Sequence, residues 1–474
     1  MRTRIDRAQS SWDIGNPGPV PEAAVLAELF LSGFRRDLRL FLPGVELGPV
    51  ECVDPSRNGT LTFSNWSAFR WLGPDASERD PEVVLFGTRY VLRAASGRWL
   101  SPQDRRLARA IGAVLDLRFQ NLFHVGGLTR MDLYRGGSED HYVAAFIKPE
   151  EYAPGARVPS RVALTIQNLR TAALSTYENH RVTSGALLLG AEARADRPTP
   201  EDALTYGLDL TGLKSLHRLC DGEHTLFLVD QGGRLADIVS IDRWSDRLVC
   251  PRVPCPRTYA AHARATVAGG NVCLVLSRHQ EIKVFAEGTQ LFAFAHGRWR
   301  MLDPERKFAA WRAVVRDFVL ARTLFQAAVD LAEARRGALI VVLDEPEQAI
   351  GRLLAPHDVL DERPSESKHQ PVHEGHARQA LHYLGRGRDV RELDPSVLEA
   401  LASIDGALVV DRDGRLVSFG AILRHEAAGR PVLAQAEGAR TTAALVASTF
   451  GTVLKVSEDG VLSCYLDGAK AWDL

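Results

Sequence analysis

The stretch DGALVVDRDGRLVSFGAIL, residues 405–423, contains two Asp-Gly pairs, each followed by an apolar run. The second pair, Asp413 and Gly414, separates two such runs and has the composition of a tight turn, so the stretch predicts a β-hairpin. The first pair, Asp405 and Gly406, precedes the first strand. Because a glycine there lets a ligand approach the main chain, Asp405 is either a turn residue or an acid held at a strand start to bind a ligand.

The segment before this hairpin predicts a helix and a buried strand. Apolar residues recur at helical spacing over residues 304–337, and Gly337 has the position of a helix C-cap. The run "ALIVVL" at 338–343 follows directly and is typical of a fully buried strand. This order of elements predicts an α/β fold with a mixed central β-sheet flanked by helices.

The segment after the hairpin contains a helix start with polar side chains. Gly438 leads into a predicted helix whose first turn holds Arg440, Thr441 and Thr442. Free N–H groups, a guanidinium and two hydroxyls at a helix N-terminus suit a phosphate group. The alternative is an ordinary helix capped by threonine.

A second polar element follows this helix. "KVSEDG" at 455–460 places Ser457, Glu458 and Asp459 at a strand end, before a turn. By itself this element indicates only a polar hairpin.

The chain contains three ordered matches that indicate duplication of one α/β unit. Each pairs a strand-turn segment of the middle region with one of the last region: 184–190 with 336–342, 215–241 with 396–422, and 275–288 with 455–468. The alternative is that short strand-turn-strand units resemble one another by chance. These boundaries predict an N-terminal α/β sensor-like region (1–150), a degenerate copy (155–302) and a C-terminal copy (304–474).

The N-terminal region shows no chemical motif. Residues 1–20 are polar and predict a loose arm. Ser101 as N-cap, Pro102 at the first helical position and Asp104 in the first turn predict a helix that starts at 102. Short strand-like runs before it make residues 21–150 a mixed α/β module.

Composition gives no global preference for a partner. The 474 residues carry a formal net charge of -1 and are 45% hydrophobic, so neither nucleic acid nor a membrane is expected as a partner. No apolar run approaches the ~18–20 residues that span a bilayer. The start lacks a signal-peptide core. We therefore expect a cytoplasmic protein with reduced cysteines.

Two segments have residues that can bind metals. Cys250 and Cys255 form one close cysteine pair, but no second pair stands at zinc-ligand spacing. Residues 355–395 contain five histidines at irregular spacing, which favours a solvated insertion over a metal site.

Taken in order, the helix, "GALIVV", the Asp-Gly-Ala hairpin, the Gly-x-Arg helix start, the "VSE" turn and the closing "DG" resemble the catalytic domain of the diadenylate cyclase (DAC) family. The resemblance covers residues 305–474. It implies ATP with Mg²⁺ or Mn²⁺, and two domains that meet face to face to make cyclic di-AMP and pyrophosphate.

The resemblance also assigns roles to residues of this chain. Asp405 would be the metal ligand and a catalytic residue, together with Arg440 and Glu458. Gly406, Ala407, Gly438, Arg440, Thr441, Thr442 and Ser457 would bind the nucleotide. Pairing of two such domains implies a homo-oligomer or intrachain pairing of the two copies.

The chain departs from the family in the phosphate motif. Ala439, Thr441 and Thr442 replace the family's Thr, His and second Arg, and Ile404 stands where a His often precedes the aspartate. These departures leave three interpretations open: a divergent cyclase, an inactive sensor of a nucleotide or cyclic dinucleotide, and an α/β scaffold without a ligand. In the middle copy Asp221, Gly222 and Arg264 were the candidate counterparts of Asp405, Gly406 and Arg440, with Glu223 and Arg278 as further departures.

Overall fold

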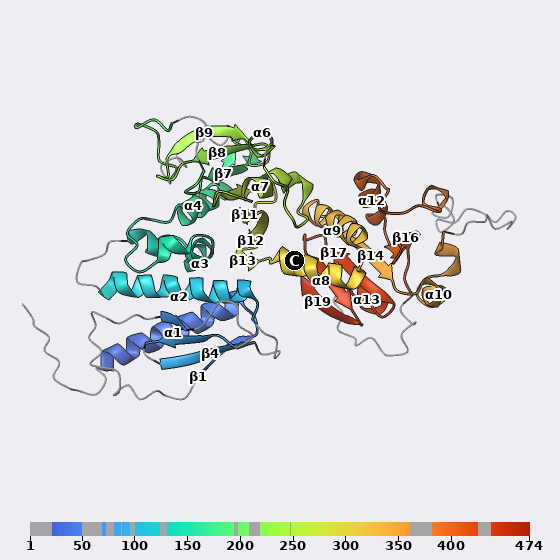
Figure 1. The fold of residues 1–474 in the computed structure, drawn as a ribbon, viewed down its shortest axis with the longest axis horizontal. Helices are drawn as coiled ribbons and strands as arrows, with labels where there is room; N and C mark the ends of the chain where they lie inside the picture. Colours follow the sequence, from blue (N-terminus) through green and yellow to red (C-terminus); the bar gives the residue numbers. More distant parts are fainter. Residues whose placement is uncertain are drawn as a thin grey trace, which may run out of the picture. The chain divides into compact units, whose positions relative to one another are not determined.

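The computed structural model describes residues 21–49, 69–72, 80–86, 88–94, 100–123, 130–193, 198–207, 219–246, 248–360, 382–424 and 438–474. The chain divides into two compact units, the N-terminal unit (residues 1–164) and the C-terminal unit (residues 165–474). Both units combine helices with β-sheets, which confirms the predicted α/β class (Figure 1). Among the described residues, none of the helices has the length and apolarity needed to cross a membrane.

The N-terminal unit contains a four-stranded antiparallel sheet in the order β1-β4-β3-β2. As predicted, the amide of Asp104 donates to Ser101 Oγ at 3.1 Å, and the amide of Ser101 donates to Asp104 Oδ2 at 2.9 Å, which caps α2. The predicted arm, 1–20, lies outside the described residues. The elements are α1 (Pro21–Phe41), β1 (Val45–Pro49), β2 (Phe69–Leu72), β3 (Glu82–Leu85), β4 (Thr88–Ala94), α2 (Pro102–Phe123), η3 (Met131–Tyr134), α3 (Ser138–Ile147) and η4 (Pro149–Tyr152).

The C-terminal unit begins with a helix and then has two large mixed sheets. Helix α4 (Arg161–Ala173), which starts at the boundary, and the short strands β5 (Thr176–Tyr177) and β6 (His180–Arg181) lead into the first sheet. The described residues of the first repeat, 184–301, form β7 (Ser184–Leu188), β8 (Thr225–Val229), β9 (Leu235–Ser240), α6 (Ile241–Ser245), η6 (Arg257–Tyr259), α7 (Ala260–Ala265), β10 (Val272–Leu276), β11 (Ile282–Ala286), β12 (Thr289–Ala295) and β13 (Arg298–Met301).

The second repeat, residues 304–474, has six strands. Its elements are α8 (Pro304–Val315), α9 (Phe318–Glu333), β14 (Ala338–Leu343), α10 (Pro346–Ala349), η7 (Pro356–Asp358), η8 (His382–Leu384), α12 (Pro395–Ala402), β15 (Ala407–Asp411), β16 (Leu416–Ala421), α13 (Ala439–Ala447), β17 (Gly451–Val456), β18 (Leu462–Leu466) and β19 (Ala469–Asp473).

The two sheets have the same topology. The order β12-β11-β10-β7-β8-β9 matches β19-β18-β17-β14-β15-β16, and β13 is an extra edge strand of the first sheet. In each sheet the pair β7–β8 or β14–β15 is parallel and the other neighbours are antiparallel. The same arrangement of strands and directions therefore occurs twice in this unit.

The registers correct one of the three sequence matches. Leu274 pairs with Ala186 in the first sheet, and Leu454, its counterpart, pairs with Ile340 in the second. Ala186 therefore corresponds to Ile340, whereas the match of "SGALLLG" to "RGALIVV" paired it with Ala338. The two-residue shift keeps each side chain on the same face, because side chains alternate along a strand.

The helix predicted over 304–337 is two helices. Arg316 has a left-handed backbone with φ of 68°, which ends α8, and Asp317 accepts a hydrogen bond from the amide of Leu320 at 2.7 Å, which caps α9. Trp311 of α8 and Phe325 of α9 are fully buried in one core. Continuous apolar spacing predicted the buried face correctly and missed the break.

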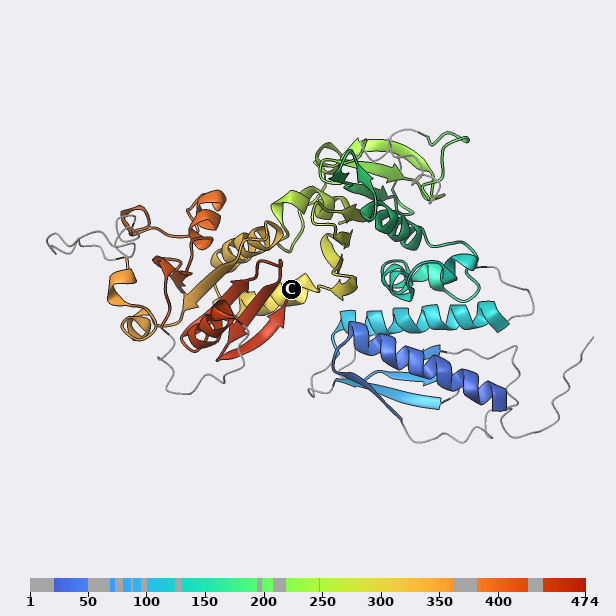
Figure 2. The same ribbon diagram turned by 180° about the vertical axis from the view of Figure 1, so that it is seen from behind.

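The second sheet is covered on both faces. Ile340 and Leu408 point into the core formed with α8, α9 and α12, and Val341 and Val409 point into the core formed with α13 and α10. Helix α9 also contacts the first repeat: Glu333 pairs with Lys283 at 2.7 Å, and Asp330 accepts from Arg257 Nε at 3.0 Å. Figures 1 and 2 show α9 between the two sheets from opposite sides.

Candidate functional site

Three chain segments meet at one edge of the second sheet. Strands β14 and β15 are parallel and both start there, and β17 ends there because Val456 pairs with Ala338. The residues just outside these strands are Asp405 before β15, Gly337 before β14 and Glu458 after β17. The topology therefore brings the predicted Asp405 and Glu458 to the same edge, with one strand between theirs.

Arg440, from the first turn of α13, reaches this edge. Its Nη1 donates to Glu458 Oε1 at 2.8 Å, and the two side chains are 43% and 72% exposed. A Cβ on Gly337 would lie 2.2 Å from the same nitrogen, so the guanidinium lies directly on that backbone. An exposed ion pair contributes ~0–1 kcal/mol, so a phosphate oxygen can replace Glu458 at little cost.

Lys455 is a second cation at this edge, and the sequence analysis missed it. Its Nζ donates to Thr441 Oγ1 at 3.1 Å, next to Arg440 on α13. Lys455 lies two residues from Val453, which packs against α13, so both side chains are on the same face of β17. The alternation of side chains along β17 could have placed Lys455 on the same face as Val453. Its role could not be predicted from that alone, because one must also know that α13 covers this face.

Gly438 begins α13 with a left-handed backbone, φ of 96°. The amides of Thr441 and Thr442 donate to its carbonyl at 3.1 and 3.2 Å, and Thr442 Oγ1 donates to the same oxygen at 3.4 Å. Within the described residues, this leaves the amides of Ala439 and Arg440 as the donors at the helix start without a partner. They belong to the same helix turn that carries the Arg440 side chain.

Asp405 is exposed, and within the described part of the chain its carboxylate has no hydrogen-bond or ion-pair partner. Gly406 has φ of 116°, and a Cβ there would lie 2.4 Å from the carbonyl carbon of Gly420. The neighbouring strand thus requires this glycine whether or not a ligand binds. Ala407 is fully buried, backbone included, so no part of it is exposed to a nucleotide in this structure.

The turn after β17 holds Ser457 in place through its backbone. The amide of Ser457 donates to Val461 O at 2.9 Å, and the amide of Gly460 donates to Ser457 O at 3.0 Å. The first repeat has the same turn, in which the amide of Ser277 donates to Glu281 O at 2.9 Å. The turn is thus a shared feature of both repeats, and only its exposed side chains differ.

The first repeat does not place Asp221 at the position of Asp405. Val229 pairs with Leu235 in the first sheet and Val410 pairs with Leu416 in the second, so Val229 and Val410 occupy equivalent positions. Counting back five residues from each valine places His224 at the position of Asp405. The Asp221 carboxylate accepts bonds from three backbone amides at 2.8–2.9 Å. Partial burial raises the pKa of Asp221, but these donors outweigh it and lower the pKa below its ordinary value.

The other expected correspondences in the first repeat also change. Arg264 lies near the end of α7, whereas Arg440 lies at the start of α13. Counting two residues on from the paired strands β10 and β17 places Arg278 at the position of Glu458, as expected. The first repeat therefore has His224 at the position of Asp405, and the first turn of α7 holds no arginine.

The second repeat could hold Mg²⁺ or Mn²⁺ through one protein carboxylate together with the phosphate oxygens of a bound nucleotide. Among the described residues no group of three or more His, Cys, Asp or Glu side chains is close enough to hold a metal. Magnesium at nucleotide sites is commonly held by one or two carboxylates together with phosphate oxygens. The free carboxylate of Asp405 fits that arrangement. His369, His373 and His376 of the histidine-rich segment lie outside the described residues.

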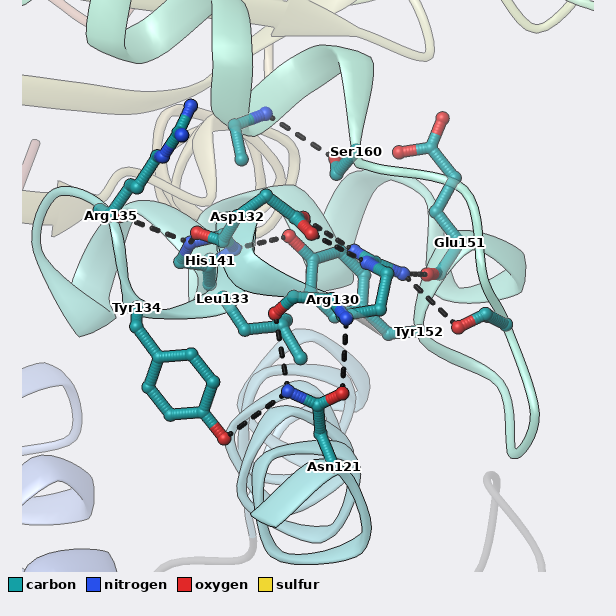
Figure 3. Close-up of polar contacts among 12 residues, drawn as sticks. Asn121, Arg130, Asp132, Leu133, Tyr134, Arg135, His141, Glu151, Tyr152 and Ser160 are labelled. Carbon is teal, nitrogen blue, oxygen red and sulfur yellow. Dashed lines mark hydrogen bonds and ion pairs between the residues drawn. The ribbon is translucent and has the colours of Figure 1, made fainter. Parts of the chain in front are cut away.

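A separate polar cluster lies inside the N-terminal unit (Figure 3). Arg130, 1% exposed, donates from Nε and Nη2 to the two oxygens of Asp132 at 2.8 and 2.7 Å. Its Nη1 donates to the carbonyls of Glu151 and Ala156, and Asn121 Oδ1 accepts from its amide at 3.0 Å. Every charge here has a partner, so the cluster joins α2, η3 and η4.

His141 belongs to the same cluster. Nε2 lies 3.0 Å from Asp132 O, and Nδ1 lies 2.8 Å from Tyr152 Oη, so Nε2 donates and Nδ1 accepts in the neutral ring (Figure 3). Burial, followed by the nearby charge of Arg118, lowers the pKa of His141. A buried neutral histidine with both nitrogens occupied stabilises the fold and does not offer a reactive nitrogen.

Comparisons with known proteins identify no family. No family model matches the chain, and no curated protein matches it. A crystal structure described as the hypothetical membrane spanning protein from Bacillus cereus is 22% identical over 31% of this chain and 60% of that chain, with a TM-score of 0.19. The chain thus spans less than two thirds of that protein, and at this score the likeness defines neither fold nor function.

Proposed function

We propose that this is a cytoplasmic signalling protein whose second repeat binds ATP with Mg²⁺ or Mn²⁺ as a divergent diadenylate cyclase-type nucleotidyltransferase. The N-terminal unit would be the sensor-like part. The observation that supports the proposal most is the shared sheet edge: the free carboxylate of Asp405 lies there together with Arg440, Lys455 and the start of α13. These groups are what a metal-bound triphosphate needs.

Each residue would have a distinct role. Arg440 and Lys455 would bind phosphate oxygens, with the free amides of α13 beside them, and Asp405 would hold the metal. The metal, when bound, would neutralise phosphate charge. On nucleotide binding, the phosphate oxygens would replace Glu458 as the partner of Arg440. In the reaction, each 3′-hydroxyl would lose its proton to water and its oxygen would form a bond to the α-phosphorus of the other ATP. The bond from that phosphorus to the α,β-bridging oxygen would break, and pyrophosphate would leave from each ATP.

This reaction needs two equivalent sites that face each other, and the partner would come from a second chain. The first repeat has His224 and Arg278 where the second repeat has Asp405 and Glu458, and the first turn of its α7 holds no arginine. The contact between the repeats also joins non-equivalent surfaces, α9 with the β11–β13 side of the first sheet. We therefore favour a homodimer over intrachain pairing as the catalytic arrangement.

A second function, nucleotide or cyclic-dinucleotide sensing without turnover, is supported by a different observation. In the first turn of α13, Arg440 is the single cation, and it is already paired with Glu458. Thr441 and Thr442 provide hydroxyl groups where the family has a His and a second Arg. Stabilisation of a developing negative charge commonly contributes ~10²–10³-fold in rate. Loss of this charge would affect turnover more than binding.

The direct test is incubation of the full chain with ATP and MnCl₂, followed by mass spectrometry of the products. The cyclase interpretation expects cyclic di-AMP from the natural protein and none from Asp405→Asn or Arg440→Ala. The matched control is Arg412→Ala, because Arg412 is a half-exposed arginine paired with Asp344 on the far side of the hairpin. ATP binding without product at any protein concentration would contradict the cyclase.

Calorimetric titration separates the two functions further. In a cyclase-type site, Mn²⁺ should tighten ATP binding, and Asp405→Asn should abolish that gain. A sensor without a metal site should bind equally well with and without Mn²⁺, and Asp405→Asn should leave its affinity unchanged. Absence of any ATP or cyclic di-AMP binding would refute both functions.

A further inference from the structure

Arg335, just after the end of α9, joins equivalent turns of the two repeats. Its Nη2 pairs with Glu281 in the β10–β11 turn of the first repeat. Its Nη1 donates to the backbone carbonyl of Asp459 in the β17–β18 turn of the second repeat at 3.2 Å. One guanidinium of the second repeat therefore contacts both turns.

Ion pairs hold Arg335 on the side of the first repeat. Glu281 also lies 3.3 Å from Lys283 Nζ, and Lys283 pairs with Glu333 of α9 at 2.7 Å, with both of these side chains 7% exposed. Acids and cations alternate in this group, so each charge has a partner of opposite sign. A buried charge that loses its partner is strongly unfavourable, so the group keeps one geometry. Arg335 is thus held in place by the contact between the repeats.

The turn that Arg335 contacts carries Glu458 of the candidate site. Glu458 directly precedes Asp459, and its Oε1 accepts from Arg440 at 2.8 Å. The same turn also lies close to α9, because a Cβ on Gly460 would lie 3.2 Å from the carbonyl oxygen of Ala332. The position of Glu458 against Arg440 therefore depends on how the end of α9 holds this turn.

A cavity of about 190 Å³ lies between the first sheet and α9, beside the Arg335 contacts. Lys283 and Ala293 line it from the first sheet, and Ala332 and Asp459 line it from the second repeat. The turn is thus not packed solidly against the first repeat at this point. It has room to move when the contacts of Arg335 are removed.

We propose that Arg335 is a positioning residue of the candidate site: held by Glu281 of the first repeat, it keeps Glu458 on Arg440 and so lowers the affinity of this sheet edge for phosphate. This inference rests on the proposed function, because it concerns the regulation of the same site. Glu458 and a phosphate oxygen compete for one guanidinium, so release of the turn favours the phosphate. The first repeat thus regulates the second through Glu281.

The first test is calorimetric titration of the full chain with ATP and MnCl₂. Glu458→Gln should tighten ATP binding about two- to fivefold, which is the range that an exposed ion pair supports. Arg335→Met, which keeps the length of the side chain and removes its donors, should tighten it by a similar factor, and Glu281→Gln should act in the same direction. Combining Arg335→Met with Glu458→Gln should give no further gain. The matched control is Arg336→Met, because Arg336 is the next residue, is exposed, and its charge acts on Glu399 of α12.

The second test needs no nucleotide and follows the modification of Arg440 by phenylglyoxal, with mass spectrometry of the peptides. Arg440 should react about two- to fivefold faster in Arg335→Met than in the natural chain, and also faster in Glu281→Gln, because Glu458 covers it less. Arg412, paired with Asp344, is the internal reference and should keep its rate in every variant.

The two tests separate this inference from the proposed function. If the natural chain does not bind ATP but Arg440 reacts faster in both variants, nucleotide binding is refuted and the positioning of Glu458 by Arg335 stands. Thermal unfolding shows which variants are folded, and one variant in each repeat covers the case in which the other does not fold. Unchanged reactivity of Arg440 in a folded variant, ATP binding that is unchanged or weaker in Arg335→Met, or additive effects of Arg335→Met and Glu458→Gln would overturn the proposal.

Discussion

His262 makes the stability of the first repeat depend on pH. The ring lies in α7 between Tyr259 and Phe285, and its Nε2 donates to Gly222 O at 2.9 Å. Its Nδ1 is buried and has no partner among the described residues, so a proton there would have no acceptor. Burial lowers the pKa of His262 from 6.5 to about 4, although the bond to Gly222 opposes this.

The direction and size of the effect follow from this lowered pKa. Above pH 6.5 the ring is neutral in the folded and unfolded chain, and its full contribution to stability is present. As the pH falls from 6.5 towards 4, the unfolded chain binds a proton that the folded chain does not, so stability is lost. A difference from 6.5 to about 4 corresponds to about 3 kcal/mol, at ~1.4 kcal/mol per pH unit.

The assay is urea unfolding of the full chain at pH 7.5, 5.5 and 4.5, compared with His262→Gln. A glutamine amide can donate to Gly222 O but does not titrate. We expect the difference in unfolding free energy between the natural chain and the variant to shrink by about 2.5 kcal/mol from pH 7.5 to 4.5, because the full effect is reached only below pH 4. If that difference stays constant with pH, His262 is not buried as a neutral ring and the reasoning is refuted.

Three further variants test other parts of the structure. Gly406→Ala, at a left-handed backbone against the next strand, should lower the unfolding free energy by ~3 kcal/mol or more in urea unfolding. Gly337→Ala should unfold like the natural chain but bind ATP about tenfold more weakly, because it displaces Arg440; unchanged affinity would contradict the proposed phosphate role. Arg130→Met should cost ~3–5 kcal/mol by leaving Asp132 buried and unpaired, and adding Asp132→Leu should recover most of it in thermal unfolding.

Local turn chemistry was predictable from the sequence. Gly414 has φ of 85°, and its amide donates to Asp411 O at 3.1 Å, as the Asp413-Gly414 pair predicted. Gly233 makes the same turn in the first repeat, with its amide 3.1 Å from Asp230 O. Such turns depend on a few adjacent residues, and for that reason they are readable without the rest of the fold.

Features that depend on long-range packing were not predictable in the same way. The break at Arg316 needs a left-handed backbone at a residue other than glycine, which tertiary contacts must stabilise. Identical letters aligned Ala186 with Ala338, although strand pairing relates it to Ile340. Local identity cannot report a register that is set by neighbouring strands.

The candidate site was predictable only in part, because some of its contacts depend on long-range packing. The resemblance of the ordered motifs to the cyclase family led us to expect Asp405, Arg440 and Glu458 in one site, and the topology places them at one sheet edge. Lys455 was missed because its role depends on which helix covers its face of β17. The cavity between the first sheet and α9 depends on the contact between the two repeats, so a motif search does not detect it.

The contact between the repeats has a consequence for assembly. It joins α9 of the second repeat to the β11–β13 side of the first, so it is a heterologous contact between two units of the same topology. Identical units with such a contact would add to one another into closed rings or open fibres. Only Leu302 and Asp303 connect β13 to α8, so the contact forms within one chain at high effective concentration. The equivalent surface of the second repeat has diverged, since Ser463 stands where the first repeat has Lys283, so it lacks the cation that pairs with Glu333 of α9.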